Sequence, residues 1–148
     1  MNKNFCLLVM AFLSLPACSS QQSDTSVLKK AIIKTNEQLL NKGNLAFADE
    51  AFAAEYAGRG PGQIKLFVKE LRTAFPDLKV KVEQLIAEGN MVAWRREHIG
   101  THKGAYMGYP PSNKTLQWNA IIISRYEDGK VVEEWGEDNL LEVLEAHK

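Results

Sequence analysis

Cysteine is almost missing from this sequence of 148 residues: Cys6 and Cys18 are its two cysteines, and both lie near its start. Cys6 falls within an apolar run, Phe5 to Leu13, that follows the basic Lys3. This order, closed by small residues before Cys18, is typical of a secretory signal peptide. The chain after Cys18 has no thiol, which excludes a disulfide, a cysteine nucleophile and a cysteine metal ligand from it.

Long hydrophobic runs are also missing, because the run from Phe5 to Leu13 is too short for a membrane-spanning helix of ~20 residues. The segment Leu15-Pro16-Ala17-Cys18 resembles a bacterial lipobox, in which Cys18 is lipidated and becomes the first mature residue. Ser19 then favours, by resemblance to enterobacterial sorting, a lipid anchor in the outer membrane of the cell envelope, facing the periplasm. Ordinary secretion with cleavage nearby is the alternative.

The chain has no excess of charge of either sign, since it contains 18 basic and 18 acidic residues. Without a basic stripe it lacks the usual footprint of a nucleic-acid-binding protein, so we expect no nucleic-acid partner. It also has no internal repeat, phosphate-binding loop, nucleophile elbow or spaced set of metal ligands. We expect a signal peptide over residues 1–17, a lipidated tether over 18–26 and a single domain over 27–148.

Apolar periodicity divides that domain into a helical half and a strand half. Helical spacing predicts helices over 25–41, 45–52 and 64–75, and Pro76 stops the last one. From Leu78 the apolar residues alternate, with strands over 91–100, 114–127 and 130–135 before a terminal helix. Helices followed by antiparallel strands indicate an α+β fold. A curved sheet under such helices leaves a cleft for a small molecule.

Several short motifs follow one another in the second half of the chain. They are Phe75-Pro76-Asp77, Gly89-Asn90, Arg95, Gly100-Thr101-His102-Lys103-Gly104, Gly108-Tyr109-Pro110-Pro111, Lys114, and Asp128-Gly129-Lys130-Val131 with Glu133, Glu134 and Trp135. Each motif alone is weak, but the ordered set resembles the SnoaL-like polyketide cyclase (ester cyclase) family of the nuclear transport factor 2-like superfamily. The resemblance implies a cone of three N-terminal helices packed on a curved, mainly antiparallel sheet, with a short C-terminal helix. It also implies a homodimer packed through the outer sheet face.

The resemblance further implies ring closure by aldol condensation without a metal or other cofactor. In that family an aspartate after the tryptophan-containing strand is the general acid and base, and a histidine of the Gly-Thr-His element lies at the pocket. The corresponding residues here are Asn139, four positions beyond Trp135, and His102. An amide cannot accept the proton, so Asn139 counts against cyclase activity. Asp138 is the neighbouring candidate for a shifted catalytic acid.

Each candidate also has a purely structural interpretation. Asp138 begins the last helix, where a carboxylate interacts with the helix dipole. His102 lies in a loop and can bond local backbone. Glu133 and Glu134 point to opposite faces of their strand, so one of them can face the pocket and act as the base.

Four further residues are candidates for ligand binding: Arg95, Tyr106, Trp118 and Trp135. Arg95 shares a strand face with Glu97, and a structural ion pair between them is the alternative. The two tryptophans line a cavity only if the cone is open, and otherwise pack in the core. Tyr106 starts the segment to Pro111, which is either a lid or a plain connection. His98 we expect at the surface or in an interface.

Two hypotheses remain for the function. The first is an ester cyclase-like enzyme that acts on a small apolar or carbonyl-bearing molecule, using His102 with Asp138 or a strand glutamate. The second is a non-catalytic ligand-binding or scaffold domain of the cell envelope, which has kept the cone and lost the base.

Overall fold

The computed structural model describes residues 25–148, so the predicted signal peptide and Cys18 lie outside the described residues. The helices α1 (Thr25–Asn36), α2 (Phe47–Ala51) and α3 (Gly62–Ala74) come first. The strands β1 (Lys79–Glu88), β2 (Met91–Thr101), β3 (Thr115–Glu127) and β4 (Lys130–Asp138) follow, and α4 (Leu140–Ala146) ends the chain. The predicted order of helices and then strands is therefore confirmed. No helix within residues 25–148 is long and apolar enough to span a membrane.

The first predicted helix is confirmed in extent, but its last turn differs in type. After Asn36 the backbone continues as a π-helical turn, η1 (Glu37–Asn41), which places Leu39 and Leu40 in the core. A 3-10 turn, η2 (Tyr56–Gly58), stands between α2 and α3. Helix α3 ends at Ala74 because Phe75 precedes a proline and leaves the helical region of φ and ψ.

The four strands form one antiparallel sheet in the order β1-β2-β3-β4. Asp128 and Gly129 make the predicted turn between β3 and β4, with φ values of 49° and 77°. Positive φ at both positions suits a two-residue hairpin, which is why glycine and aspartate are favoured there. Strand β4 runs past its predicted end at Trp135 to Asp138.

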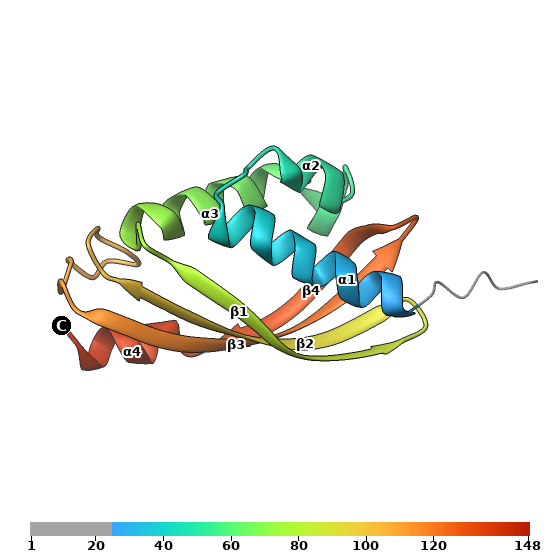
Figure 1. Cartoon of the computed structure of the whole chain (residues 1–148). Helices are drawn as coiled ribbons and strands as arrows, with labels where there is room; N and C mark the ends of the chain where they lie inside the picture. The colour runs from blue at the N-terminus through green and yellow to red at the C-terminus, as the bar shows by residue number, and fades with distance from the viewer. Residues whose placement is uncertain (1–24) are drawn as a thin grey trace, which may run out of the picture.

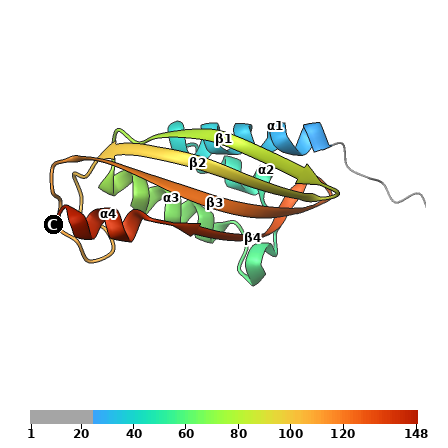
Figure 2. The same ribbon diagram turned by 90° about the horizontal axis from the view of Figure 1, so that it is seen from below.

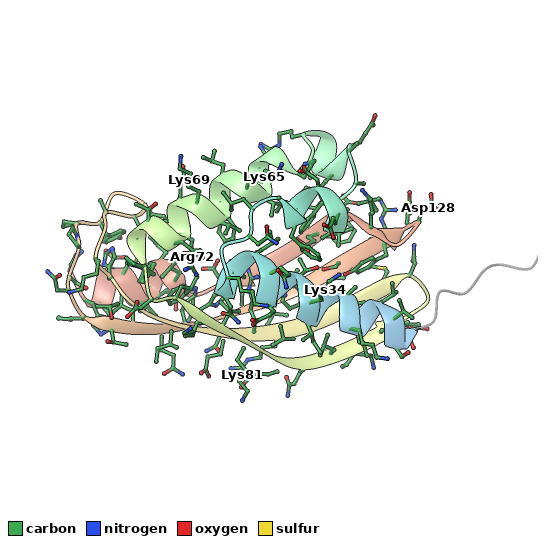
Figure 3. All side chains as sticks on the ribbon, turned by 45° about the horizontal axis from the view of Figure 1, so that its top comes forward. Lys34, Lys65, Lys69, Arg72, Lys81 and Asp128 are labelled. Atoms are coloured by element: carbon green, nitrogen blue, oxygen red, sulfur yellow. The ribbon has the colours of Figure 1, made fainter. Side chains whose placement is uncertain are left out.

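Helices α1, α2 and α3 cover one face of this sheet (Figure 1). The opposite face is seen in Figure 2, with the four strands in front of those helices. Lys65 and Lys69 project from α3 away from the sheet, whereas Lys81 projects from its uncovered side (Figure 3). We call the covered side the inner face and the uncovered side the outer face. The predicted α+β arrangement is confirmed.

Strand alternation decides which side chains of β2 reach the helices. Trp94 and His98 are buried on the inner face with 5% and 2% of their surface exposed, and Arg96 lies between them. His98 stacks on Trp118 with ring centroids 4.8 Å apart and an interplanar angle of 3°. The expectation that His98 lies at the surface or in an interface is therefore wrong.

Candidate functional site

A cavity of about 70 Å³ lies between the helices and the inner face, and we call it the central cavity. A buried water needs about 10–15 Å³ of cavity volume, so the central cavity has room for roughly five waters or one small ring compound. Aliphatic and aromatic side chains from α1, η1, α3 and the strands make most of its wall. Its polar lining residues are Thr35, Asn36, Arg96, Tyr126 and Glu134.

Glu134 is the carboxylate of the central cavity, and both of its oxygens accept hydrogen bonds. The hydroxyl of Ser124 donates to Oε1 over 2.6 Å, and the hydroxyl of Tyr56 donates to Oε2 over 3.1 Å. Trp94 Nε1 donates in turn to the Ser124 oxygen over 2.9 Å. Burial raises the pKa of Glu134 above its usual range, although these bonds and the charge of Arg96 act in the opposite direction.

Arg96 supplies the positive charge of the same cavity. Its NH1 donates to Asn36 Oδ1 over 3.0 Å, and Asn36 Nδ2 donates to the Ile32 carbonyl over 2.9 Å. The guanidinium also lies over the Trp94 ring, 5.2 Å from its centroid. Burial lowers the pKa of Arg96 to about 10, while Glu134 raises it, so Arg96 stays charged at neutral pH.

Two polar atoms of the cavity have no hydrogen-bond partner among the described residues, namely the Tyr126 hydroxyl and Arg96 Nε. An unpaired buried donor costs about 1–3 kcal/mol of stability. Water or a bound molecule relieves that cost, so these atoms mark where an acceptor is best placed.

A more open hollow of about 190 Å³ adjoins the central cavity along β4 and shares Arg96, Ile122 and Glu134 with it. Asp138 borders this hollow, because the register Arg96–Ala120–Asp138 puts all three residues on the inner face. Asp138 is exposed, and its Oδ1 accepts a hydrogen bond from the Leu140 backbone over 2.9 Å. It therefore stands at the mouth of the site and also bonds the first turn of α4.

Asn139, which the sequence resemblance was expected to place at the position of the family's catalytic aspartate, does not line the central cavity. Its Oδ1 accepts a hydrogen bond from the Asn119 backbone over 2.9 Å. Its own backbone N–H donates to the Asn119 carbonyl over 3.3 Å. The side chain thus extends the pairing of β3 and β4 beyond the end of the strand.

His102 is buried with 1% of its surface exposed, but it packs in the core and does not line the central cavity. Its ring stacks on Phe75, with centroids 5.1 Å apart, and Phe75 also contacts Trp118 at 4.8 Å and Tyr106 at 6.2 Å. Burial lowers the pKa of His102. Trp118 and Tyr106 therefore join an aromatic cluster with His102, outside the residues that line the cavity.

Tyr106 and Tyr109 exchange two backbone hydrogen bonds of 3.0 and 2.9 Å across the tip of the segment that was expected to be a lid or a connection. The preceding loop is held against α3, because the Lys103 and Gly104 backbones both donate to the Ala74 carbonyl. None of the residues from 106 to 111 lines the central cavity.

Arg95 and Trp135 lie on the outer face. Arg95 forms an ion pair with Glu83 and donates to Asn119 Oδ1 over 2.7 Å. The expected pair with Glu97 is wrong, because Glu83 on neighbouring β1 takes that place. Arg95 does not line the central cavity, since its side chain is on the other side of the sheet. Trp135 is 47% exposed and is opposite Ile123 in the register.

Sequence reasoning missed Arg96, Asn36, Tyr56 and Tyr126. Arg96 carried a usable signal, because it is a charged residue between Trp94 and His98 on the same strand face. The other three carried none. Asn36 and Tyr126 line the cavity and Tyr56 bonds Glu134 because of how α1, β3 and η2 pack together. Among the strand glutamates, Glu134 is the one that faces the cavity, whereas Glu133 pairs with Arg125 at 3.2 Å.

Several solved structures have the same fold as this chain. TsrD from Streptomyces laurentii superposes with a TM-score of 0.77 at 22% identity, over 84% of this chain and 96% of that chain. AclR from Streptomyces galilaeus gives 0.72 at 25% identity, over 83% and 98%. A SnoaL-like polyketide cyclase from Agrobacterium tumefaciens gives 0.70 at 18% identity, over 80% and 95%. Among curated proteins, none matches the chain.

A family model settles the relationship. The model described as SnoaL-like polyketide cyclase matches residues 30–146, which include every helix and strand from α2 to α4 and the second half of α1. The match thus spans the central cavity and the hollow beside it. By this match the chain belongs to the SnoaL-like polyketide cyclase family.

Proposed function

We propose that the protein binds a small apolar or carbonyl-bearing molecule in the central cavity and moves a proton on it without a cofactor. Glu134 is the general acid and base of this proposal. The observation that carries it is a partly buried carboxyl, with a raised pKa, in the wall of a largely apolar cavity. A general base works best when its pKa lies near the working pH, and burial moves a glutamate in that direction.

In the proposed step the Glu134 carboxylate takes a proton from the carbon next to the ligand carbonyl. The electron pair of that C–H bond moves into the carbonyl and gives an enolate, and Glu134 becomes a neutral acid. The charge of Arg96 in the same wall favours the enolate. Return of a proton from Glu134 to carbon restores the ketone. Attack of the enolate carbon on a second carbonyl of the same molecule closes a ring instead, and the alkoxide formed from that carbonyl takes the proton from Glu134, which becomes a carboxylate again.

The test is exchange of the α-hydrogens of cyclohexanone in D2O, followed by NMR with the purified protein. Wild type should exchange them faster than buffer, and Glu134→Gln should lose roughly a hundredfold of that rate or more. Glu133→Gln is the matched control, because Glu133 neighbours Glu134 but pairs with Arg125 outside the cavity. Equal rates in wild type and Glu134→Gln would contradict the proposal.

A non-catalytic ligand-binding or scaffold domain is the second candidate. One observation favours it: both oxygens of Glu134 already accept hydrogen bonds. The expectation that Asn139 replaces the family's catalytic aspartate agrees with it. Cyclohexanone that binds in the cavity while its α-hydrogens exchange at the buffer rate would support this candidate over the enzyme.

We also propose that two copies of the chain pack through their outer faces as a homodimer. The register aligns Ile86, Ala93, Ile123 and Trp135 in one row across all four strands, which we call the outer apolar row. Ile86 is 73% exposed and Ile121, beside the row, 60%. Contiguous exposed apolar surface of this kind is typical of an interface, and the same face is open in Figure 2.

For the N-terminal segment we propose lipidation of Cys18 and an anchor in the bacterial outer membrane. The support is the lipobox-like sequence before Cys18 and the polar stretch from Ser19 to Asp24, before α1, that can act as a tether. Mass spectrometry of the protein from membranes should find an acylated Cys18 as the first residue. A Cys18→Ser variant should be found unprocessed, whereas a soluble mature form of the wild type would support ordinary secretion.

A further inference from the structure

We propose that the Tyr126 hydroxyl recognises the ligand, by donating a hydrogen bond to an oxygen on an otherwise apolar, uncharged molecule. This inference rests on the proposed function, because it requires that the central cavity holds a ligand. Tyr126 is the residue that binds the polar group of the ligand. It favours one chemical class of ligand, namely neutral compounds with a carbonyl oxygen.

The first argument is that the backbone fixes the position of Tyr126. Its N–H donates to the Asn90 carbonyl over 2.9 Å, and its carbonyl accepts from Asn90 Nδ2 over 2.9 Å. The register between β3 and β4 shifts just before Tyr126, next to Arg125. Bulges of this kind re-aim side chains. The residue is 3% exposed and lines the central cavity. Because this donor is already fixed in place, ligand binding loses little further conformational entropy there.

The second argument is that the neighbouring donors are already used. Tyr56 and Ser124 donate to Glu134, and Trp94 donates to Ser124. The hydroxyl of Tyr126 is instead buried without a partner among the described residues. A buried hydroxyl without an acceptor is costly, so a molecule that brings an acceptor gains more there than elsewhere in the wall.

The third argument concerns charge. Burial first, and then the carboxyl of Glu134, raise the pKa of Tyr126, which keeps its hydroxyl protonated and therefore a donor. The same carboxyl disfavours a negatively charged group beside it. Arg96 Nε is the other unpartnered donor of the cavity, but removing Arg96 would leave Glu134 without its counter-charge. The Tyr126 hydroxyl is therefore the unpartnered donor that can be removed by mutation without changing the charge of the cavity.

Thr35 and Tyr126 also border a separate hollow between α1, α2 and the β3–β4 turn, so the Tyr126 ring is part of the wall between two spaces. Phenylalanine keeps this ring and removes only the hydroxyl. Tyr126→Phe consequently tests hydrogen bonding without opening the cavity. Tyr106→Phe is the matched control, because it removes a hydroxyl from a partly buried tyrosine that does not line the central cavity, and it should leave the affinity for the ketone unchanged.

The experiment compares two probes of nearly the same shape, cyclohexanone and methylenecyclohexane, which carry C=O and C=CH2 at the same place. Binding to the purified protein is followed by the methyl NMR signals of the cavity residues Ile32, Ile64 and Ile122. Wild type should bind the ketone more tightly than the alkene. Tyr126→Phe should bind the ketone roughly five- to tenfold more weakly and the alkene equally well. Its melting temperature should equal or exceed that of wild type.

Three outcomes overturn the inference in distinguishable ways. Equal ketone affinity in wild type and Tyr126→Phe would remove Tyr126 from recognition and leave the proposed function standing. A loss of affinity for both probes would show that the hydroxyl acts on the shape of the cavity. Binding of neither probe to wild type would contradict the proposed function and the inference with it.

Discussion

Tyr56 donates its hydroxyl hydrogen to Glu134 Oε2 over 3.1 Å and so ties η2 to the inner face of β4. The two residues are 78 positions apart in the chain. This bond holds the carboxyl of Glu134, a residue of the cavity wall that the proposed chemistry uses.

We expect Tyr56→Phe to raise the pKa of Glu134 further, because the hydrogen bond from Tyr56 favours the charged carboxylate. Carboxyl carbon NMR titration measures this directly. A folded-state pKa raised above the unfolded value gives stability at low pH that is lost as pH rises through the folded pKa. The variant should therefore lose more unfolding free energy at pH 7, about 1 kcal/mol, than at pH 4. An unchanged pKa would show that the bond does not act on Glu134.

His98 should make the protein sensitive to acid. Burial first, and then the charge of Arg96, lower its pKa to about 3. Since the unfolded side chain titrates near 6.5, the unfolded state binds more protons between about pH 6.5 and 3, and stability falls as pH falls through that window. His98→Phe keeps a ring against Trp118 and removes the titration. Its unfolding free energy should drop by about 1–2 kcal/mol less than that of wild type between pH 7 and pH 5.

Chemical denaturation at several pH values checks this difference in slope. The slope left in His98→Phe belongs to other groups, including His102, whose pKa is also lowered by burial. Parallel stability curves for wild type and variant would mean that His98 is protonated in the folded state.

Periodicity and turn residues predicted most of this fold, because they act locally. The strand boundaries at Met91 and Glu127 and the Asp128-Gly129 turn follow directly from alternation and turn chemistry. Alternation also showed that Glu133 and Glu134 face opposite ways. Which of them meets the cavity depends on the side of the sheet that the helices cover, and no local pattern contains that information.

The remaining differences have the same origin. Arg95 was expected to pair with Glu97 along its own strand, but Glu83 on neighbouring β1 is its partner. A register shift between Val82 and Gln84 sets where Glu83 lies. No residue pattern in the sequence predicts a β-bulge at this position. Long-range pairs such as Tyr56 with Glu134 are likewise decided by tertiary packing.

Asn139→Asp separates the site proposed here from the position that the sequence resemblance predicts for the family's catalytic aspartate. The amide oxygen of Asn139 accepts from the Asn119 backbone, and a carboxylate can accept the same bond. We therefore expect Asn139→Asp to change the unfolding free energy by less than about 1 kcal/mol and to leave the exchange rate of cyclohexanone unchanged. Asn139→Ala should lose about 1 kcal/mol, because the Asn119 N–H is left without its acceptor.

A gain of exchange in Asn139→Asp that Glu134→Gln does not abolish would place the acid and base chemistry at the start of α4. The double variant, Asn139→Asp with Glu134→Gln, distinguishes the two positions in one measurement.

Trp135→Lys should dissociate the proposed homodimer. Trp135 is 47% exposed in the outer apolar row, and large aromatic residues at the centre of an interface contribute most to its affinity. A charge placed there should weaken the dimer by roughly thirtyfold or more, measured by sedimentation at several concentrations. Leu66→Lys is the control, because Leu66 is 55% exposed on α3, on the helical side of the sheet. Equal dissociation by both variants would exclude the outer face as the contact. A wild type that sediments as a monomer at every concentration would contradict the dimer itself, and the row would then have to be covered by a different partner.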